Sequence, residues 1–150
     1  MDISKNGFLK DIIKHLKVVS NDSPDYFINE LNKSKIPLEI FNEKNFLINW
    51  DEVTPSYKFF FDYVGCEDEI SDLLSKSHLF NENTVIIAIS NDKPIIEVET
   101  KIFINHWYSF FAASGYVGVV VMGKSKKFFL EMVDRDFNFY SNFPVKESKK

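Results

Sequence analysis

The sequence predicts a single α+β domain in which helices pack against a mainly antiparallel sheet. A length of 150 residues is typical of one domain. Segments with helical spacing are followed by short β-type segments, and most of these are joined by turns rather than by crossover helices. Aromatic residues, mostly phenylalanine, make up 16% of the chain and provide enough apolar area for a core without a metal or disulfide.

Two helices are predicted near the N-terminus, over about residues 6–34. Apolar side chains recur at helical spacing from 6 to 19, with lysines towards the other side. The second helix begins at Ser23-Pro24, where serine is the N-cap and proline takes the first helical position, and it ends before Pro37. We expect the two helices to form a helical hairpin.

A mainly β region is predicted over about residues 45–143, followed by a charged, frayed tail at 146–150. Helices at 67–77 and 103–115 interrupt it, and the first of them opens with three acidic residues. The segment 117–121 is apolar at nearly every position, so we expect it at the centre of the sheet with both faces covered. The expected strands are 46–48, 58–64, 84–89, 94–99, 117–122, 127–133 and 137–141.

The charge of the chain is unevenly distributed around a net value of −4. Residues 1–40 are balanced, whereas residues 41–100 contain four lysines and twelve acidic residues. Residues 101–150 reverse the sign, with eight basic and four acidic residues. Phosphate binding needs clustered cations, so the acidic middle third disfavours nucleic acid as a direct partner. It suits either a basic protein partner or a simple solvated acidic surface.

The aromatic segment 103–115 contains the pair His106-Trp107, which could be a ligand site or part of a core helix. Helical spacing places Phe103, Trp107 and Phe110 on one stripe. The adjacent stripe consists of Ile104, Tyr108 and Phe111. These stripes form one wide apolar face and His106 projects elsewhere, so we interpret the segment as the core helix against which the sheet packs.

No catalytic, metal or cofactor site is predicted. His15, His78 and His106 are widely separated, and no two have the spacing of a preformed ligand pair. Cys66 has no second thiol to pair with, and the carboxylates of residues 67–69 oppose the activation of its thiol. The chain contains no nucleophile elbow, P-loop or dinucleotide fingerprint.

The same sequence predicts a cytoplasmic location. A single cysteine forms no internal disulfide and suits a reducing compartment. The first residues lack the apolar stretch of a signal peptide, and no apolar run approaches the roughly 18 residues of a membrane span.

Carboxylates could nevertheless build a small enzyme site or a ligand-binding site. Glu97 and Glu99 alternate onto one face of a strand, while Glu131, Asp134 and Asp136 surround a turn. Pairs of this kind perform acid–base chemistry when burial separates their proton affinities. This alternative requires at least two of these carboxylates to converge in a pocket.

The acidic residues of the middle third instead predict a surface that binds a basic protein. The candidate contacts are Asp62, Glu67, Asp68, Glu69, Asp72, Glu97 and Glu99. A third possibility is a structural or oligomerisation module, although we favour a monomer.

The stretch from Thr84 to Phe143 resembles immunity proteins of bacterial polymorphic toxin systems, including those of contact-dependent growth inhibition. The resemblance consists of a hairpin, an aromatic helix, small residues that stop it and a closing hairpin. The residues that carry it are Trp107, Phe110, Phe111, Gly115, Gly118, Glu131, Asp136 and the ending Tyr140-Ser141-Asn142-Phe143.

This resemblance implies a small cytoplasmic domain without enzymatic activity or a cofactor, which binds and neutralises one cognate toxin domain. Many such toxins are nucleases with basic clefts, and an acidic inhibitor can occupy a cleft of that kind by charge complementarity. The expected partner is therefore a basic toxin protein, with no direct contact to nucleic acid or membrane.

Overall fold

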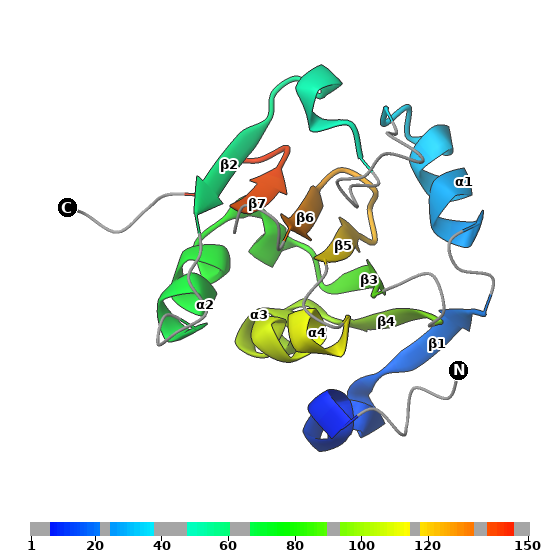
Figure 1. Cartoon of the computed structure of the whole chain (residues 1–150), viewed down its shortest axis with the longest axis vertical. Helices are drawn as coiled ribbons and strands as arrows, with labels where there is room; N and C mark the ends of the chain where they lie inside the picture. Colours follow the sequence, from blue (N-terminus) through cyan, green and yellow to red (C-terminus); the bar gives the residue numbers. More distant parts are fainter. Residues whose placement is uncertain are drawn as a thin grey trace.

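The described part of the chain folds around a seven-stranded sheet in which all neighbouring strands are antiparallel (Figure 1). The computed structural model describes residues 7–21, 25–37, 48–60, 67–89, 94–114, 118–133 and 138–145. In spatial order the strands are β1 (Lys17–Ser20), β4 (Ile95–Glu99), β3 (Thr84–Ala88), β5 (Gly118–Gly123), β6 (Phe129–Val133), β7 (Asn138–Ser141) and β2 (Tyr57–Phe60). The predicted α+β class is confirmed.

Strands that follow one another in the second half of the chain also pair in the sheet. β3 pairs with β4, β5 with β6, and β6 with β7, as turn-connected strands do. β5 is the middle strand, and it alternates between the two faces: Val119 and Val121 face one core, while Val120 and Met122 face the other. The predicted central strand is therefore confirmed.

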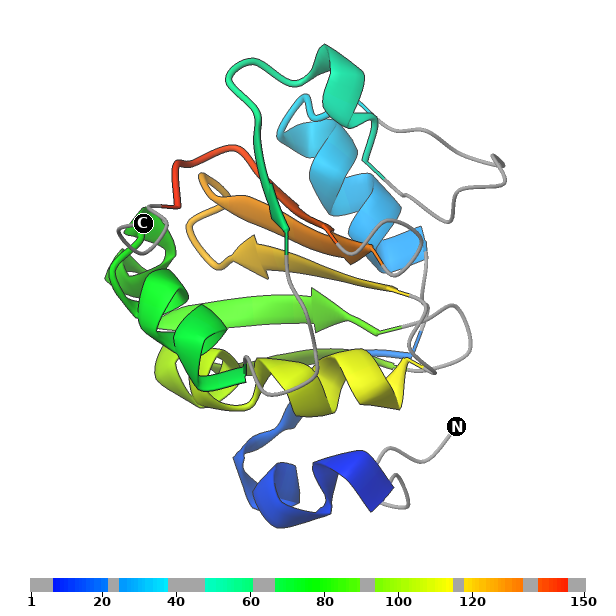
Figure 2. The same ribbon diagram turned by 60° about the vertical axis from the view of Figure 1, so that its left-hand side comes forward.

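Helices cover both faces of the sheet (Figure 2). One face carries η2 (Gly7–His15), α2 (Glu67–Ser75), η4 (His78–Asn81), α3 (Thr100–Asn105) and α4 (Trp107–Ala113), where η denotes a 3-10 helix. The opposite face carries α1 (Asp25–Lys33) and η3 (Trp50–Glu52). No helix within the described ranges has the length and apolar character that crossing a bilayer would require.

The aromatic segment is the centre of the larger core, as predicted. Phe103, Trp107, Phe110 and Phe111 are each at most 1% exposed. The helix is nevertheless divided into α3 and α4, because His106 leaves helical geometry with φ −127° and ψ 23°. The amide of His106 still donates to the carbonyls of residues 102 and 103, so the two helices continue in one packed unit.

The predicted N-terminal helical hairpin is wrong. Residues 17–19 of the expected first helix, together with Ser20, form the edge strand β1, which pairs with β4. Val18 and Val19 are β-branched, and strand pairing provides backbone hydrogen bonds while Val19 packs against the smaller core. The remaining piece, η2, packs on α4, whereas α1 lies on the other face of the sheet.

Several expected boundaries fall outside the described residues. These include the Ser23-Pro24 cap, the turn at 90–93 and the tail at 146–150. Of the expected strand 46–48, only Ile48 is described, and it forms a single bridge.

Candidate interaction surface

Helix α2 is held against the larger core on one side and presents carboxylates on the other. Ile70 and Leu74 are buried, as the helical spacing predicts. The hydroxyl of Ser71 donates to the carbonyl oxygen of Ile104 at 2.8 Å, and Trp107 Nε1 donates to the carbonyl oxygen of Glu67 at 3.0 Å. These two bonds fix the orientation of α2 against α3 and α4.

Four carboxylates lie on this helix, and we call Glu67, Asp68, Glu69 and Asp72 the α2 acidic surface. Asp68, Glu69 and Asp72 are exposed, and Glu67 is half-buried. Asp72 pairs with Lys76 at 3.0 Å, whereas none of the other three has an ion-pair partner among the described residues. The first three also occupy the first helical turn, where the helix dipole favours negative charge.

Glu97 and Glu99 do not join this surface. Glu97 lies on the α1 face of the sheet, directly across from Lys17, and its Oε2 pairs with Lys124 Nζ at 3.1 Å. Glu99 is exposed at the end of β4, beside the start of α3. Asp62, the remaining predicted contact, is outside the described residues.

The turn between β5 and β6 gathers carboxylates from three separate elements. Lys124 pairs with Glu97, and the amide of Ser125 donates to Glu82 Oε1 at 2.9 Å. The next residue, Lys126, pairs with Glu30 of α1. Lys124 and Lys126 of this turn are thus paired within the molecule, and neither pairs with the carboxylates of α2.

Glu30 is nearly buried between two ammonium groups. Its hydrogen bond with Lys126 is the main cause that holds the pKa of the Glu30 carboxyl below its ordinary value, with a weaker contribution from Lys33. Burial acts in the opposite direction and is outweighed. The contact joins α1 to the β5–β6 turn.

Glu131 is buried within the fold rather than exposed in an open pocket. Its Oε1 accepts hydrogen bonds from Trp50 Nε1 at 2.9 Å and from the Ile48 amide at 3.4 Å. The ring of Trp50 stacks on Tyr140 with 6.1 Å between centroids. This carboxylate therefore binds η3 to the sheet.

The carboxylates named for an enzyme or ligand site lie in three separate surroundings. Glu97 pairs with Lys124, Glu131 lies under Trp50, and Glu99 is exposed at the end of its strand. Asp134 and Asp136 are outside the described residues. No two of the three described carboxylates share a pocket.

The described histidines are also separated. The His78 ring lies beside the Phe128 ring, with 5.9 Å between their centroids. His106 lies at the break between α3 and α4. Among the residues that the structure describes, no three histidine, cysteine or acidic side chains gather as a metal site would require. Cys66 is outside the described ranges.

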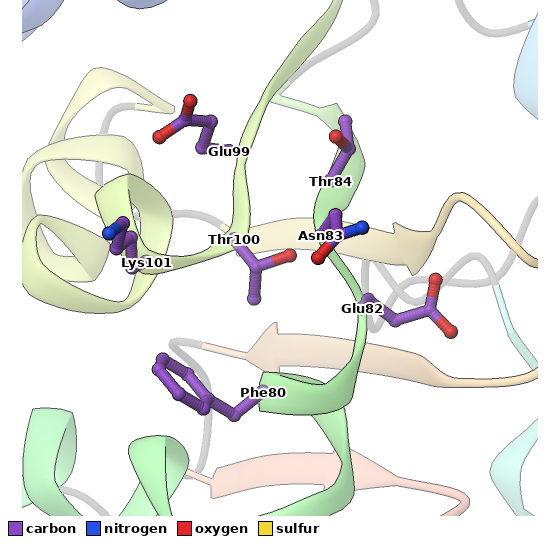
Figure 3. Close-up of a pocket in the computed structure, with 7 residues that line it drawn as sticks. All are labelled: Phe80, Glu82, Asn83, Thr84, Glu99, Thr100 and Lys101. Atoms are coloured by element: carbon purple, nitrogen blue, oxygen red, sulfur yellow. The ribbon is translucent and has the colours of Figure 1, made fainter.

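A pocket of about 440 Å³ opens where η4, β3 and the start of α3 meet (Figure 3). Its lining is formed by Phe80, Glu82, Asn83, Thr84, Glu99, Thr100 and Lys101, and we call it the Thr100 pocket. Glu99 was predicted as a contact residue, whereas the other six were missed. The pairing of β3 with β4 places Thr84 opposite Glu99, and this register is the feature that would have predicted the grouping.

No family model and no curated protein matches the chain. The resemblance to immunity proteins therefore stays a prediction from the residues.

Proposed function

We propose that this protein is an immunity protein, which binds a cognate toxin domain through the α2 acidic surface and thereby blocks it. The observation that carries the proposal is the set of three carboxylates, Glu67, Asp68 and Glu69, that have no ion-pair partner among the described residues on a helix fixed by packing. A rigid surface loses little conformational entropy on binding, which favours tight association.

The expected partner is a basic protein domain, such as a nuclease whose cleft binds phosphates. Such a cleft attracts carboxylates over a range of about 10 Å at 0.1 M salt. Electrostatic steering of this kind raises association rates by about tenfold to a thousandfold. The complex would form in the cytoplasm, where the toxin acts, and the protein would need no chemistry of its own.

Glu97 is not included in the proposed surface. It lies on the opposite face of the sheet from α2 and is already paired with Lys124. Alternation along β4 places Glu99 on that same face together with Glu97, so Glu99 is not included either.

The test uses the C-terminal domain encoded by the reading frame next to this one as the candidate toxin. The double variant Asp68→Lys/Glu69→Lys should slow association by about tenfold or more and abolish protection of growing cells. A matched control is Asp51→Lys/Glu52→Lys, which reverses two exposed carboxylates of η3 on the other face of the sheet.

Both variants must remain folded by circular dichroism, because reversal in the first turn of α2 also removes a favourable interaction with the helix dipole. Equal slowing by the two variants would indicate a general charge effect and contradict the assignment to α2. Unchanged binding by the α2 variant would also overturn the proposal.

A further inference from the structure

Helix α1 is attached to the sheet by few side chains. Among the α1 residues whose burial is described, 28–33, the buried ones are Glu30 and Leu31. Leu31 belongs to the smaller core, and Ile36 packs against that core just after the helix. Figure 2 shows α1 on the face of the sheet opposite to α3 and α4. A helix of nine residues is shorter than the roughly 12–15 residues that an isolated helix needs, so α1 depends on these contacts for its helical structure.

The C-terminus of α1 is a Schellman motif in which a lysine takes the left-handed position. The amide of Ile36 donates to the carbonyl oxygen of Leu31 at 3.0 Å. The amide of Lys35 donates to the carbonyl oxygen of Asn32, also at 3.0 Å. Lys35 has φ 60°, a conformation that glycine usually provides at this position because a β-carbon is disfavoured there. The end of α1 therefore carries strain that glycine would remove.

A second left-handed lysine lies on the other side of the same contact. Lys126 of the β5–β6 turn has φ 68°, its amide donates to the carbonyl oxygen of Gly123 at 2.8 Å, and its ammonium pairs with the buried Glu30 carboxylate. Lys35 and Lys126 are the two non-glycine residues with positive φ in the described ranges. Glycine at 126 would close the turn with less strain, so the lysine weakens the turn and at the same time provides the cation for Glu30.

We infer that the Glu30–Lys126 pair is a latch that holds α1 on the sheet, and that α1 opens as a separate unit when this pair breaks. In the open state α1 loses its helical structure, while the sheet and the helices of the larger core remain folded. Regions with few buried apolar contacts open in this local way, and the larger core contains no described residue of α1. Opening uncovers Val120 and Met122, which share the smaller core with Leu31. The inference does not depend on the proposed function.

Amide hydrogen exchange followed by mass spectrometry tests the latch, under conditions in which reclosing is faster than exchange. Glu30→Gln keeps the shape of the side chain and removes its charge. We expect this variant to exchange about tenfold faster or more over residues 25–37, because a hydrogen bond between charged groups is lost. Peptides from β5 and α4 should keep the rates of the parent. Glu97→Gln is the matched control, because it breaks the neighbouring pair with Lys124 in the same turn and should leave α1 unchanged.

Lys126→Gly separates a latch from a merely structural role of the lysine. This variant relieves the strain of the turn and removes the cation that pairs with Glu30. We expect α1 to exchange about tenfold faster, while β5 and β6 exchange at the same rate as in the parent or more slowly. The double variant Glu30→Gln/Lys126→Gly should exchange little faster at α1 than either single variant, because both break one contact.

Lys35→Gly tests the same inference without altering an ion pair, and it should slow the exchange of α1 by about threefold while the core is unchanged. The inference is overturned if Glu30→Gln speeds exchange equally in α1 and β5, because α1 would then open only with the whole protein. Unchanged exchange of α1 in Lys126→Gly would also overturn it. An equal effect of Glu97→Gln would indicate a general effect of charge and contradict the latch.

Discussion

The two faces of the sheet are built in different ways. Among the residues that the structure describes, the face under α2, α3, α4 and η2 carries a cluster of 23 buried apolar residues, and the face under α1 and η3 carries a cluster of eight. Both buried carboxylates of the described residues, Glu30 and Glu131, belong to the second face. The first face is thus stabilised by apolar burial, and the second combines a small apolar cluster with charged hydrogen bonds.

This difference bears on function as well as on stability. Burial of a large apolar area fixes α2 rigidly, so its outer side can carry unpaired charge without loss of the fold. On the other face, the buried carboxylates of Glu30 and Glu131 bind Lys126 and Trp50, and these contacts join α1 and η3 to the rest of the fold. The candidate interaction surface therefore lies over the face with the larger core.

The largest expected loss of stability comes from a substitution in the apolar face. Trp107 is 1% exposed, meets Phe139 edge-on at 5.4 Å and donates a hydrogen bond to Glu67. We expect Trp107→Ala to lower the free energy of unfolding by about 3–5 kcal/mol, measured by urea denaturation. The neighbouring His106→Ala should change it by less than about 0.5 kcal/mol. A larger loss from the histidine would contradict the assignment of this segment to a core helix.

The second prediction concerns a substitution in the polar face. Glu131→Leu removes the acceptor of the Trp50 indole and the Ile48 amide, which then remain buried and unpaired. We expect a loss of about 1–3 kcal/mol in urea denaturation. The double variant Glu131→Leu/Trp50→Phe should recover part of that loss, because it removes one of the unpaired donors. Additive losses in this double-mutant cycle would show that the two groups are not coupled.

The third prediction concerns acid stability. The pKa of Glu30 is lowered mainly by its hydrogen bond to Lys126, so its contribution is present above the ordinary glutamate pKa of 4.5 and is lost as pH falls below it. Urea denaturation of the parent should therefore show stability falling at acidic pH. Glu30→Gln should reduce that fall, whereas Glu97→Gln serves as a comparison for a more exposed pair. If the free energy of unfolding fell equally with pH in Glu30→Gln and in the parent, the prediction would be wrong.

The smallest expected effect is at the exposed turn. The Lys124 ammonium is more than half exposed, so its ion pair with Glu97 is screened by solvent. We expect Glu97→Gln to change the free energy of unfolding by no more than about 1 kcal/mol in urea denaturation. A loss comparable to that of Glu131→Leu would contradict the assignment of this pair to a solvent-screened site, in contrast to the buried Glu131.

Local patterns predicted much of the fold. The apolar spacing of 67–77 and 103–115, and the hairpin residues of the second half, gave the correct elements within a few residues. The N-terminal segment failed because residues 17–20 satisfy both a helical and an edge-strand pattern, and only pairing with β4 decides between them. Helix α2 was predicted at the correct position. Glu97 was grouped with its carboxylates, although it lies on the other face of the sheet. The sequence alone does not show on which face of the sheet a helix packs.

By itself the sequence determined the α+β class, the central β5 strand, the aromatic core helix and the acidic character of α2, because each depends on periodicity or composition within a short window. The tertiary structure decided the strand order, the separation of η2 from α1, the burial of Glu131 and the assembly of the Thr100 pocket. These features join residues that are far apart along the chain, so the contacts that fix them exist only once the sheet has formed.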